Sequence, residues 1–302
     1  MNSLLEESEY LVEWHALKEQ LASFSSTELG RKSIIEKEIP IKLEDSQDLL
    51  DENKEITDLE IESNNLLSFE GVFDVEDNIK ICSKGGVVSS KALLEIAETI
   101  SSAQRLKKII LNNNLRPTLS LKVNKLIDHI QVAKTLNNGI EKTGRISDGA
   151  SKNLANLRQK LNYLKNDRRK ILDKFINKNN KFIQDTIIGD RYGRPVIAIK
   201  VNYADKFKGI IHDSSSSGNT IFIEPEAVVS KGNDIASMQA KISNAEFNLL
   251  KKWSFMISEN AVSLISNSKI LLQLENALTR SRYSRWIKGN PPKFEKNINV
   301  CL

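Results

Sequence analysis

The chain has 302 residues and a formal net charge of +5, with 40% apolar and 27% charged residues. This length allows about two domains with sizeable cores. No run of about 18 apolar residues occurs, and the acidic N-terminal sequence MNSLLEESEY lacks a basic or apolar signal region. These features argue against a transmembrane helix and a signal peptide, so we expect a cytoplasmic protein with no membrane partner.

Charge is unevenly distributed along the sequence. Residues 1–80 hold 21 Asp/Glu against 7 Lys/Arg, whereas residues 81–302 hold 18 against 37, giving net charges of −14 and +19. This separation indicates a basic part that binds a polyanion and an acidic part that faces elsewhere. A helical protein with solvated charged faces is the alternative. Cys82 and Cys301 form no zinc pattern, so we expect no metal site.

The first 150 residues have apolar positions at helical spacing. Ser25 and Glu28 match the S-x-x-E capping box, which predicts a helix that begins there and ends before Pro40. Glycines break the stretch 71–88, and Pro117 is expected to interrupt the helical pattern. Further helices are expected over residues 4–22, 44–62, 90–112 and 119–137.

A heptad pattern then appears on both sides of a short insert. It runs through 151–182 and returns after residue 233, which predicts an antiparallel coiled coil, a long arm with the insert at its tip. A last helix is expected over 268–288, stopped by Pro291-Pro292. Basic residues near its end would complement its dipole; they are Arg280, Arg282, Arg285 and Lys288. The tail has no closing element, so we expect the natural chain to continue.

The insert, residues 191–225, has β character. Two β-branched runs, Val196–Val201 and Thr220–Ile223, predict strands, and the Ser/Gly cluster 214–219 predicts the turn. The fold class expected from all these patterns is mainly α, with an inserted antiparallel coiled coil that carries a small antiparallel β tip.

Basic residues crowd the first arm and the tip, with aromatic residues among them. Such a surface can hold a DNA or RNA backbone through counterion release, largely without sequence preference. A solvated coiled-coil flank is the alternative. The candidate nucleic-acid-binding residues are Lys165, Arg168, Arg169, Lys170, Arg191, Arg194, Lys200, Lys206 and Lys208.

Three catalytic or metal-binding interpretations of the sequence fail. Counted from Asp213, the serine loop matches the oxygen positions of a calcium-binding EF-hand, but β-branched residues flank it where helices are needed. His212 beside Asp213 has no G-x-S-x-G elbow, so a hydrolase triad is not supported. No G-x-x-x-x-G-K-[ST] loop occurs, so we expect no catalytic site and no ATP binding within these residues.

One long run carries a family resemblance. Gly209–Pro225, GIIHDSSSSGNTIFIEP, together with RYGR at 191–194, ISDGAS at 146–151 and STELGR at 26–31, resembles bacterial MutS-like proteins of the anti-recombination branch that ends in an Smr domain. Pro195 departs from the pattern, because an extended V-x-P-V-K-like strand is usual there. The motif residues, expected to be structural, are His212, Asp213, Ser217, Gly218, Thr220, Phe222, Glu224 and Pro225.

The resemblance implies a helical lever or core domain interrupted by a clamp that closes around DNA in a homodimer. The domains would be 1–150 and 260–302 for the lever and 151–259 for the clamp, with coiled-coil arms 151–182 and 233–259 and a β tip 183–232. It implies suppression of homologous recombination on branched DNA, or alternatively action on stalled ribosomes through RNA. An ATPase domain using ATP and Mg²⁺ and an Smr nuclease domain would follow residue 302.

Overall fold

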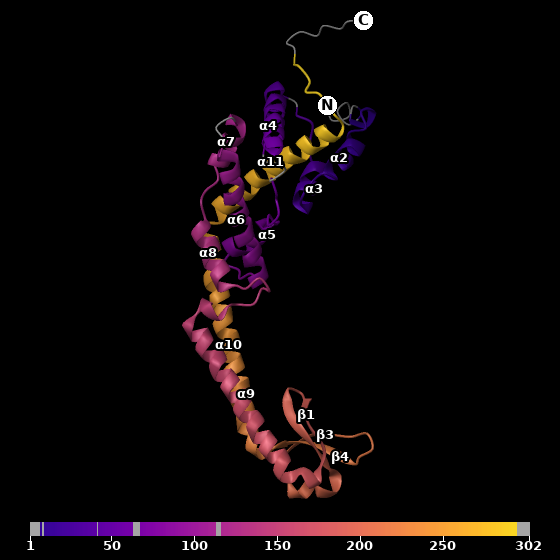
Figure 1. Ribbon diagram of the computed structural model, residues 1–302, viewed down its shortest axis with the longest axis vertical. Helices are drawn as coiled ribbons and strands as arrows, with labels where there is room; N and C mark the ends of the chain where they lie inside the picture. The colour runs from indigo at the N-terminus through magenta and orange to yellow at the C-terminus, as the bar shows by residue number, and fades with distance from the viewer. Residues whose placement is uncertain (1–6, 8, 41, 63–66, 113–115, 295–302) are drawn as a thin grey trace. The chain divides into compact units, whose positions relative to one another are not determined.

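The computed structural model describes residues 7, 9–40, 42–62, 67–112 and 116–294. It confirms a mainly α fold with a small antiparallel β-sheet (Figure 1). Contacts divide the chain into two compact units. Unit 1 comprises Met1–Arg145 and Leu250–Leu302, and unit 2 comprises Ile146–Leu249. Two stretches that are far apart in the sequence therefore build unit 1.

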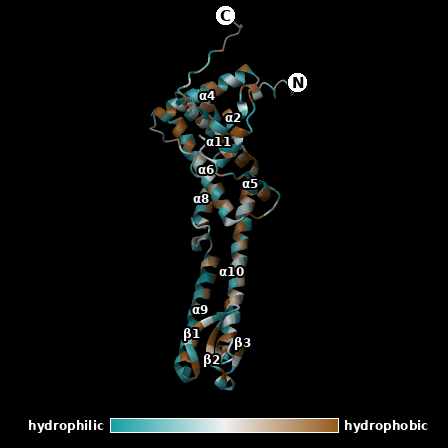
Figure 2. Ribbon diagram, turned by 90° about the vertical axis from the view of Figure 1, so that its right-hand side faces the viewer, coloured by the Kyte–Doolittle hydropathy of each residue, from teal (hydrophilic) through white to brown (hydrophobic). Residues whose placement is uncertain are grey.

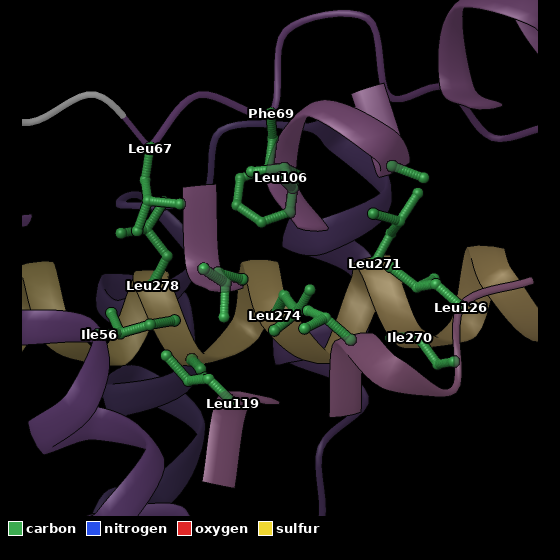
Figure 3. Packing of buried hydrophobic residues seen from close by; sticks show 14 of the residues in the cluster. Ile56, Leu67, Phe69, Leu106, Leu119, Leu126, Ile270, Leu271, Leu274 and Leu278 are labelled. Atoms are coloured by element: carbon green, nitrogen blue, oxygen red, sulfur yellow. The ribbon is translucent and has the colours of Figure 1, made fainter. Parts of the chain in front are cut away.

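Unit 1 is helical in its described residues. Its core packs the apolar face of α11 (Ala261–Trp286) against side chains of several other helices, including Ile56, Leu106 and Leu119 (Figure 3). Burial of each large aliphatic side chain contributes roughly 1.5–3 kcal/mol. The other helices of unit 1 are α2 Trp14–Ala22, α3 Glu28–Ile35, α4 Leu43–Glu62, α5 Glu76–Ser83, α6 Ser90–Leu111, α7 Pro117–Asn124, α8 Ile130–Gly139 and the last residues of α10, Glu226–Glu259.

The predicted capping box at Ser25 is wrong. Thr27 is the N-cap of α3, and its hydroxyl accepts a hydrogen bond from the Gly30 amide at 3.0 Å. A tertiary contact explains the difference, because Glu275 of α11 accepts from both the amide and the hydroxyl of Thr27, each at 2.7 Å. Glu28 is the first residue of the helix rather than the partner of Ser25.

The predicted helix over 4–22 is not continuous in its described part. Residues 1–6 and 8 lie outside the described residues, and α2 begins only at Trp14 because Glu13 has a left-handed backbone, with φ of 52°. A left-handed residue cannot continue a right-handed helix. The last helix likewise differs from the predicted 268–288, since α11 already begins at Ala261.

The single helix predicted over 119–137 is two helices, α7 and α8. Pro117 starts α7 at its first turn, where a missing amide hydrogen has no cost. The segment between them is fixed by Asn267 of α11, whose side chain accepts from the Ile127 amide at 3.0 Å and donates to the Ile127 carbonyl at 2.8 Å. The helix α5 within the glycine-broken stretch 71–88 was not predicted.

The acidic helix α4 meets basic side chains inside unit 1. Buried Glu60 pairs with Arg282 at 3.1 Å and Arg285 at 3.4 Å. Buried Glu52 pairs with Arg280 at 2.9 Å. The basic end of α11 therefore neutralises two buried carboxylates of α4, which is a more direct role than the predicted complement to its own dipole.

Unit 2 begins with α9 (Lys152–Asn179) and returns along α10. The two helices run antiparallel, since Arg158 of α9 pairs with Glu246 at 2.6 Å and Asp167 of α9 pairs with Lys231 at 2.9 Å (Figures 1 and 2). The predicted heptad seam is buried unevenly. Leu154 of the seam is buried, whereas the seam leucines Leu157, Leu161 and Leu164 are only half-buried; Leu172, which is not a seam position, is buried.

Between the two helices lies a four-stranded antiparallel sheet of order β1-β2-β4-β3. The two predicted strands are the central ones, and two edge strands were not predicted. Pro195 lies in β2 opposite Asp190, so the altered family position still pairs within the sheet. The second coiled-coil arm was predicted to begin at residue 233, whereas α10 already begins at Glu226. The strands are β1 Ile183–Arg191, β2 Arg194–Lys200, β3 Gly209–Ser214 and β4 Thr220–Pro225.

The sheet and α9 share a small core. It consists of buried aliphatic residues of α9, the sheet and the first turn of α10, namely Leu172, Ile176, Ile183, Ile197, Ile199, Ile221, Ile223 and Val228. None of the helices in the described part of the chain is both long and apolar enough to cross a membrane.

Candidate nucleic-acid interface

Unit 2 carries the positive charge of the chain. Its residues include 17 Lys/Arg and 11 Asp/Glu, a net charge of +6, whereas unit 1 has 27 Lys/Arg and 28 Asp/Glu, a net charge of −1. In Figure 2 the hydrophilic colour dominates α9. The net positive charge thus belongs to one compact unit, whereas the sequence alone assigned it to all residues after residue 80.

The flank of α9 faces a groove beside the sheet. Three of the predicted cations, Lys165, Arg168 and Arg169, line this groove. Opposite them lie Ile187 of β1 and Pro195 of β2. The pairing of β1 with β2 is irregular between Asp185 and Gly189, so this part of β1 departs from the regular ladder where it borders the groove.

One of the two acidic residues near these cations is paired with another residue. Asp167 forms an ion pair with Lys231, and the hydrogen bond between them raises the pKa of the Lys231 ammonium. Asp173 also lines the groove. Within unit 2, all of whose residues are described, Lys165, Arg168 and Arg169 have no ion pair. Lys170 is exposed on α9 outside the groove lining.

A second basic surface lies where α9 enters the sheet. The Lys206 ammonium is 4.8 Å from the Phe182 ring centre and 5.2 Å from the Tyr203 ring centre. The Lys200 ammonium donates to the Lys181 carbonyl at 3.4 Å. Lys208, between the short helix η3 (Val201–Lys206) and β3, is exposed. Aromatic faces thus hold cations at the surface in this part of unit 2.

Arg191 and Arg194, also predicted to contact phosphates, are engaged with carboxylates. Arg191 Nε donates to Asp213 at 2.9 Å and its guanidinium lies 4.2 Å from the Phe222 ring centre. This hydrogen bond lowers the pKa of the Asp213 carboxyl, which keeps Asp213 charged. Arg194 donates to Asn233 at 2.8 Å and pairs with Glu224 at 3.5 Å.

The motif residues surround a buried carboxylate. Glu224 has no exposed surface, and its Oε2 lies 2.9 Å from His212 Nε2. His212 stands at a bulge of β3, which lets it reach Glu224 while the next residue, Asp213, reaches Arg191. Gly232 of α10 packs so closely on Arg194 that a Cβ would collide with the guanidinium.

The rest of the motif forms the hairpin between β3 and β4. The Ser215 hydroxyl accepts from the Thr220 amide at 3.1 Å, and the Ser215 amide donates to the Thr220 carbonyl at 2.8 Å. Gly218 has a φ of 69°, a left-handed conformation that glycine adopts without strain. Ser217 lies 3.3 Å from the Ser215 hydroxyl, and Pro225 pairs with Gly209.

Sequence reasoning did not find the Glu224-centred cluster. The residues that join it are separated by up to 39 positions, and pattern alone cannot pair Arg194 with Asn233. Gly232, in the second turn of α10, is the one local signal, because a glycine inside a helical pattern usually has a packing reason. Among the described residues, no group of three or more His, Cys, Asp or Glu is placed to hold a metal ion.

No family model matches the chain. Curated relatives named Endonuclease MutS2 are similar to it: 28% identity to the Synechocystis protein over 97% of this chain, 29% to that of Shouchella clausii over 95%, and 30% to that of Geobacillus sp. WCH70 over 94%. The chain spans only 36–37% of the length of these relatives.

The similarity extends through both units and includes the arm and its sheet. It places the chain among MutS-like proteins. Within them, the relatives that match nearly the whole of this chain are MutS2 proteins.

Proposed function

We propose that unit 2 is a clamp that holds duplex or branched DNA by its backbone, and that unit 1 is the lever domain that carries it. The observation that supports this most is that seven of the nine cations predicted to bind nucleic acid have no carboxylate partner in unit 2. They lie on the α9 flank and near the entry to the sheet: Lys165, Arg168, Arg169, Lys170, Lys200, Lys206 and Lys208.

Salt dependence follows from this arrangement. Each phosphate neutralised by a cation releases condensed counterions, so the logarithm of the binding constant falls with the logarithm of salt concentration by about 0.9 for each contact. If all seven cations reach phosphates, the slope for duplex DNA is roughly −6. Backbone contacts of this kind carry no sequence preference.

The test is fluorescence anisotropy with a labelled duplex and a labelled four-way junction from about 50 to 200 mM salt. The variant Lys165→Gln/Arg168→Gln/Arg169→Gln should bind the duplex and the junction more weakly. The magnitude of its salt slope should be smaller by about 3. A matched variant in unit 1, Lys91→Gln/Lys108→Gln/Lys134→Gln, removes three exposed lysines and should bind as the wild type does. Equal loss in both variants, or no salt slope, would contradict the clamp.

We also propose the finer assignments of the family for the whole protein: a homodimer that suppresses homologous recombination by acting on branched DNA in the cytoplasm. Junction affinity well above duplex affinity would support a branched target, and equal affinity would oppose it. ATP, Mg²⁺ and the nuclease activity in the relatives' name are assigned to parts of those proteins outside these residues, since the chain has no G-x-x-x-x-G-K-[ST] loop to hold a triphosphate.

A structured RNA, as on a stalled ribosome, is the alternative target. Tyr192 favours it, because this side chain is 89% exposed at the apex of the β1–β2 hairpin, beside Arg191. Aromatic side chains stack on unpaired bases, which are commoner in folded RNA than in duplex DNA. Competition between ribosomal particles and junction DNA separates the targets. Tyr192→Ala should weaken binding to ribosomal particles, and not to junction DNA, if RNA is the target. If Tyr192 contacts no nucleic acid, the variant should bind both as the wild type does.

A further inference from the structure

Ile187 of β1 is an aliphatic residue that the core of unit 2 does not use. Its side chain is 72% exposed, whereas its neighbour Ile188 packs against the core formed by the sheet and α9. Single exposed apolar residues are common on protein surfaces and need no explanation by themselves. Ile187 differs from such residues in its backbone and in its surroundings.

The backbone at Ile187 forms a bulge. Asp185 pairs with Ala198 of β2, and Gly189 pairs with Val196. Three residues of β1 therefore lie between these pairs, opposite one residue of β2. Such extra residues leave the regular ladder and redirect a side chain. The Asp185 carboxylate accepts a hydrogen bond from the Ile187 amide at 2.9 Å, so this amide has an acceptor within the bulge. The exposed position of Ile187 is thus fixed by the strand.

The groove that Ile187 lines is cationic. It has a volume of about 700 Å³, and three of its lining residues are Lys165, Arg168 and Arg169, which have no ion pair within unit 2. Among the described residues that line it, Asp173 is the one carboxylate, so three cations less one carboxylate leave a net charge of +2.

This combination favours a particular kind of anion. The cations attract phosphates, but the aliphatic side chain gains free energy only where the same ligand also offers apolar surface. The faces of nucleic-acid bases are such a surface. In a regular duplex they are hidden by stacking, whereas at a branch point the stack is interrupted.

We propose that Ile187 is a wedge that enters an opened base step while the cations of the groove hold the flanking phosphates. The ligand class is therefore DNA whose base stack is already interrupted, rather than regular duplex. Apolar side chains, Ile among them, insert between base steps in other DNA-binding proteins, and unstacking a regular step costs free energy. Ile is β-branched and stiff, so little conformational freedom is lost on insertion. This inference rests on the proposed DNA binding of unit 2.

The test uses the 302-residue chain and a four-way junction with 2-aminopurine beside the branch point. This base analogue fluoresces weakly when it is stacked and strongly when it is unstacked. Binding of the wild type should raise the fluorescence, because the wedge holds the step open. Ile187→Ala should bind the junction about tenfold more weakly and leave the fluorescence close to that of free DNA. Its salt slope should equal that of the wild type, because no charge is removed.

Two further variants assign the effect to this position. Ile211→Ala removes an isoleucine that is 57% exposed on β3, the other edge strand, outside the groove lining, and should behave as the wild type does. Ile187→Met keeps a long apolar side chain and should retain the rise in fluorescence. Because Ile187 lies outside the core, Ile187→Ala should leave hydrogen exchange of the sheet amides unchanged.

Four results would overturn the wedge while the clamp stands. One is an Ile187→Ala variant that binds the junction and raises the fluorescence as the wild type does. Another is an equal loss in Ile211→Ala. A loss confined to ribosomal particles would assign the groove to RNA. A lower sedimentation mass of Ile187→Ala with unchanged fluorescence would assign Ile187 to a contact between copies of the chain.

Failure of the clamp itself has a different signature. A wild type that binds neither the junction nor the duplex would contradict the clamp, and so would full binding by the variant Lys165→Gln/Arg168→Gln/Arg169→Gln. Either result would overturn the wedge as well. Loss of affinity and salt slope in that variant, together with loss of fluorescence but not of slope in Ile187→Ala, assigns separate roles to the cations and the wedge.

Discussion

His212 and Glu224 lie 2.9 Å apart, Nε2 to Oε2, with the carboxylate wholly buried at the base of the sheet. Arg194 approaches the other oxygen at 3.5 Å. A carboxylate in such a place is stabilised only by its partners, because burial removes its hydration. Glu224 therefore links β2, β3 and β4.

Replacement of this carboxylate should destabilise unit 2. Glu224→Ala leaves Arg194 and His212 without their shared acceptor, and leaving such donors unsatisfied costs roughly 1–3 kcal/mol. Hydrogen exchange of the amides in residues 194–225, followed by mass spectrometry, should show faster exchange. Glu226→Ala, an exposed neighbour, is the control. Unchanged exchange in Glu224→Ala would show that the cluster is not stabilising.

Loss of the Asp213 charge should strengthen DNA binding. Asp213 accepts from Arg191 at 2.9 Å, and that hydrogen bond lowers the pKa of the carboxyl, so Arg191 stays neutralised at neutral pH. Asp213→Asn should raise the affinity for duplex DNA several-fold and steepen the salt slope by about 1. Asp234→Asn makes the same charge change on α10 and should have less effect. Weaker binding in Asp213→Asn would mean that Asp213 positions Arg191 for contact.

The stability of unit 1 should depend on pH through Glu275. Burial raises the pKa of this carboxyl, against the opposing hydrogen bonds from Thr27. A carboxyl with a raised folded pKa contributes stability below its ordinary value of 4.5, and that stability is lost as pH rises through the folded pKa. The free energy of unfolding of the wild type should thus fall relative to Glu275→Gln as pH rises from about 4 to 8.

Urea unfolding followed by tryptophan fluorescence measures this difference. Glu275→Ala should cost about 1–3 kcal/mol at the low end of this pH range, because the Thr27 amide loses its acceptor. The exposed Glu28, in the same region, provides the control Glu28→Gln. A wild-type stability that rises over this pH range relative to Glu275→Gln would show that the carboxylate is favoured by its surroundings.

A methyl group at Gly209 should disturb the edge of the sheet. A Cβ there would collide with the backbone carbonyl of Glu224, since Gly209 pairs with Pro225 of β4 at this position. Gly209→Ala should destabilise unit 2 by about 1–3 kcal/mol. Gly149→Ala is a matched control in the same unit, because its Cβ would meet only the Ser147 hydroxyl at an ordinary 3.5 Å. Equal hydrogen exchange in the two variants would contradict the close approach.

The sequence predicted the elements whose signals are local. The helix that begins after Ser89 has its cap and apolar face within one stretch, and Ser89 does accept from the Ala92 amide at 3.2 Å. The two central strands have buried faces, which produce apolar runs. The edge strands β1 and β3 are mostly exposed, so their sequences lack the alternation that identifies a strand.

Contacts between distant residues could not be predicted. Thr27 rather than Ser25 caps α3 because Glu275, 248 residues away, holds it. For the candidate interface, composition alone located the basic part of the chain. It could not show that Arg191 and Arg194 are paired with carboxylates while Lys165, Arg168 and Arg169 share a groove, since those relationships depend on tertiary structure.

The division of unit 1 between two stretches of sequence sets an order of folding during synthesis. Buried Glu52 and Glu60 find Arg280 and Arg282 only after α11 has been made, and Leu274 and Leu278 complete the same core. Until then the ribosome has released the N-terminal helices with an unfinished core and with the buried acid Glu60 lacking its arginine partners. The whole of unit 2 must therefore emerge before unit 1 becomes stable, so the arm can fold before the body that carries it.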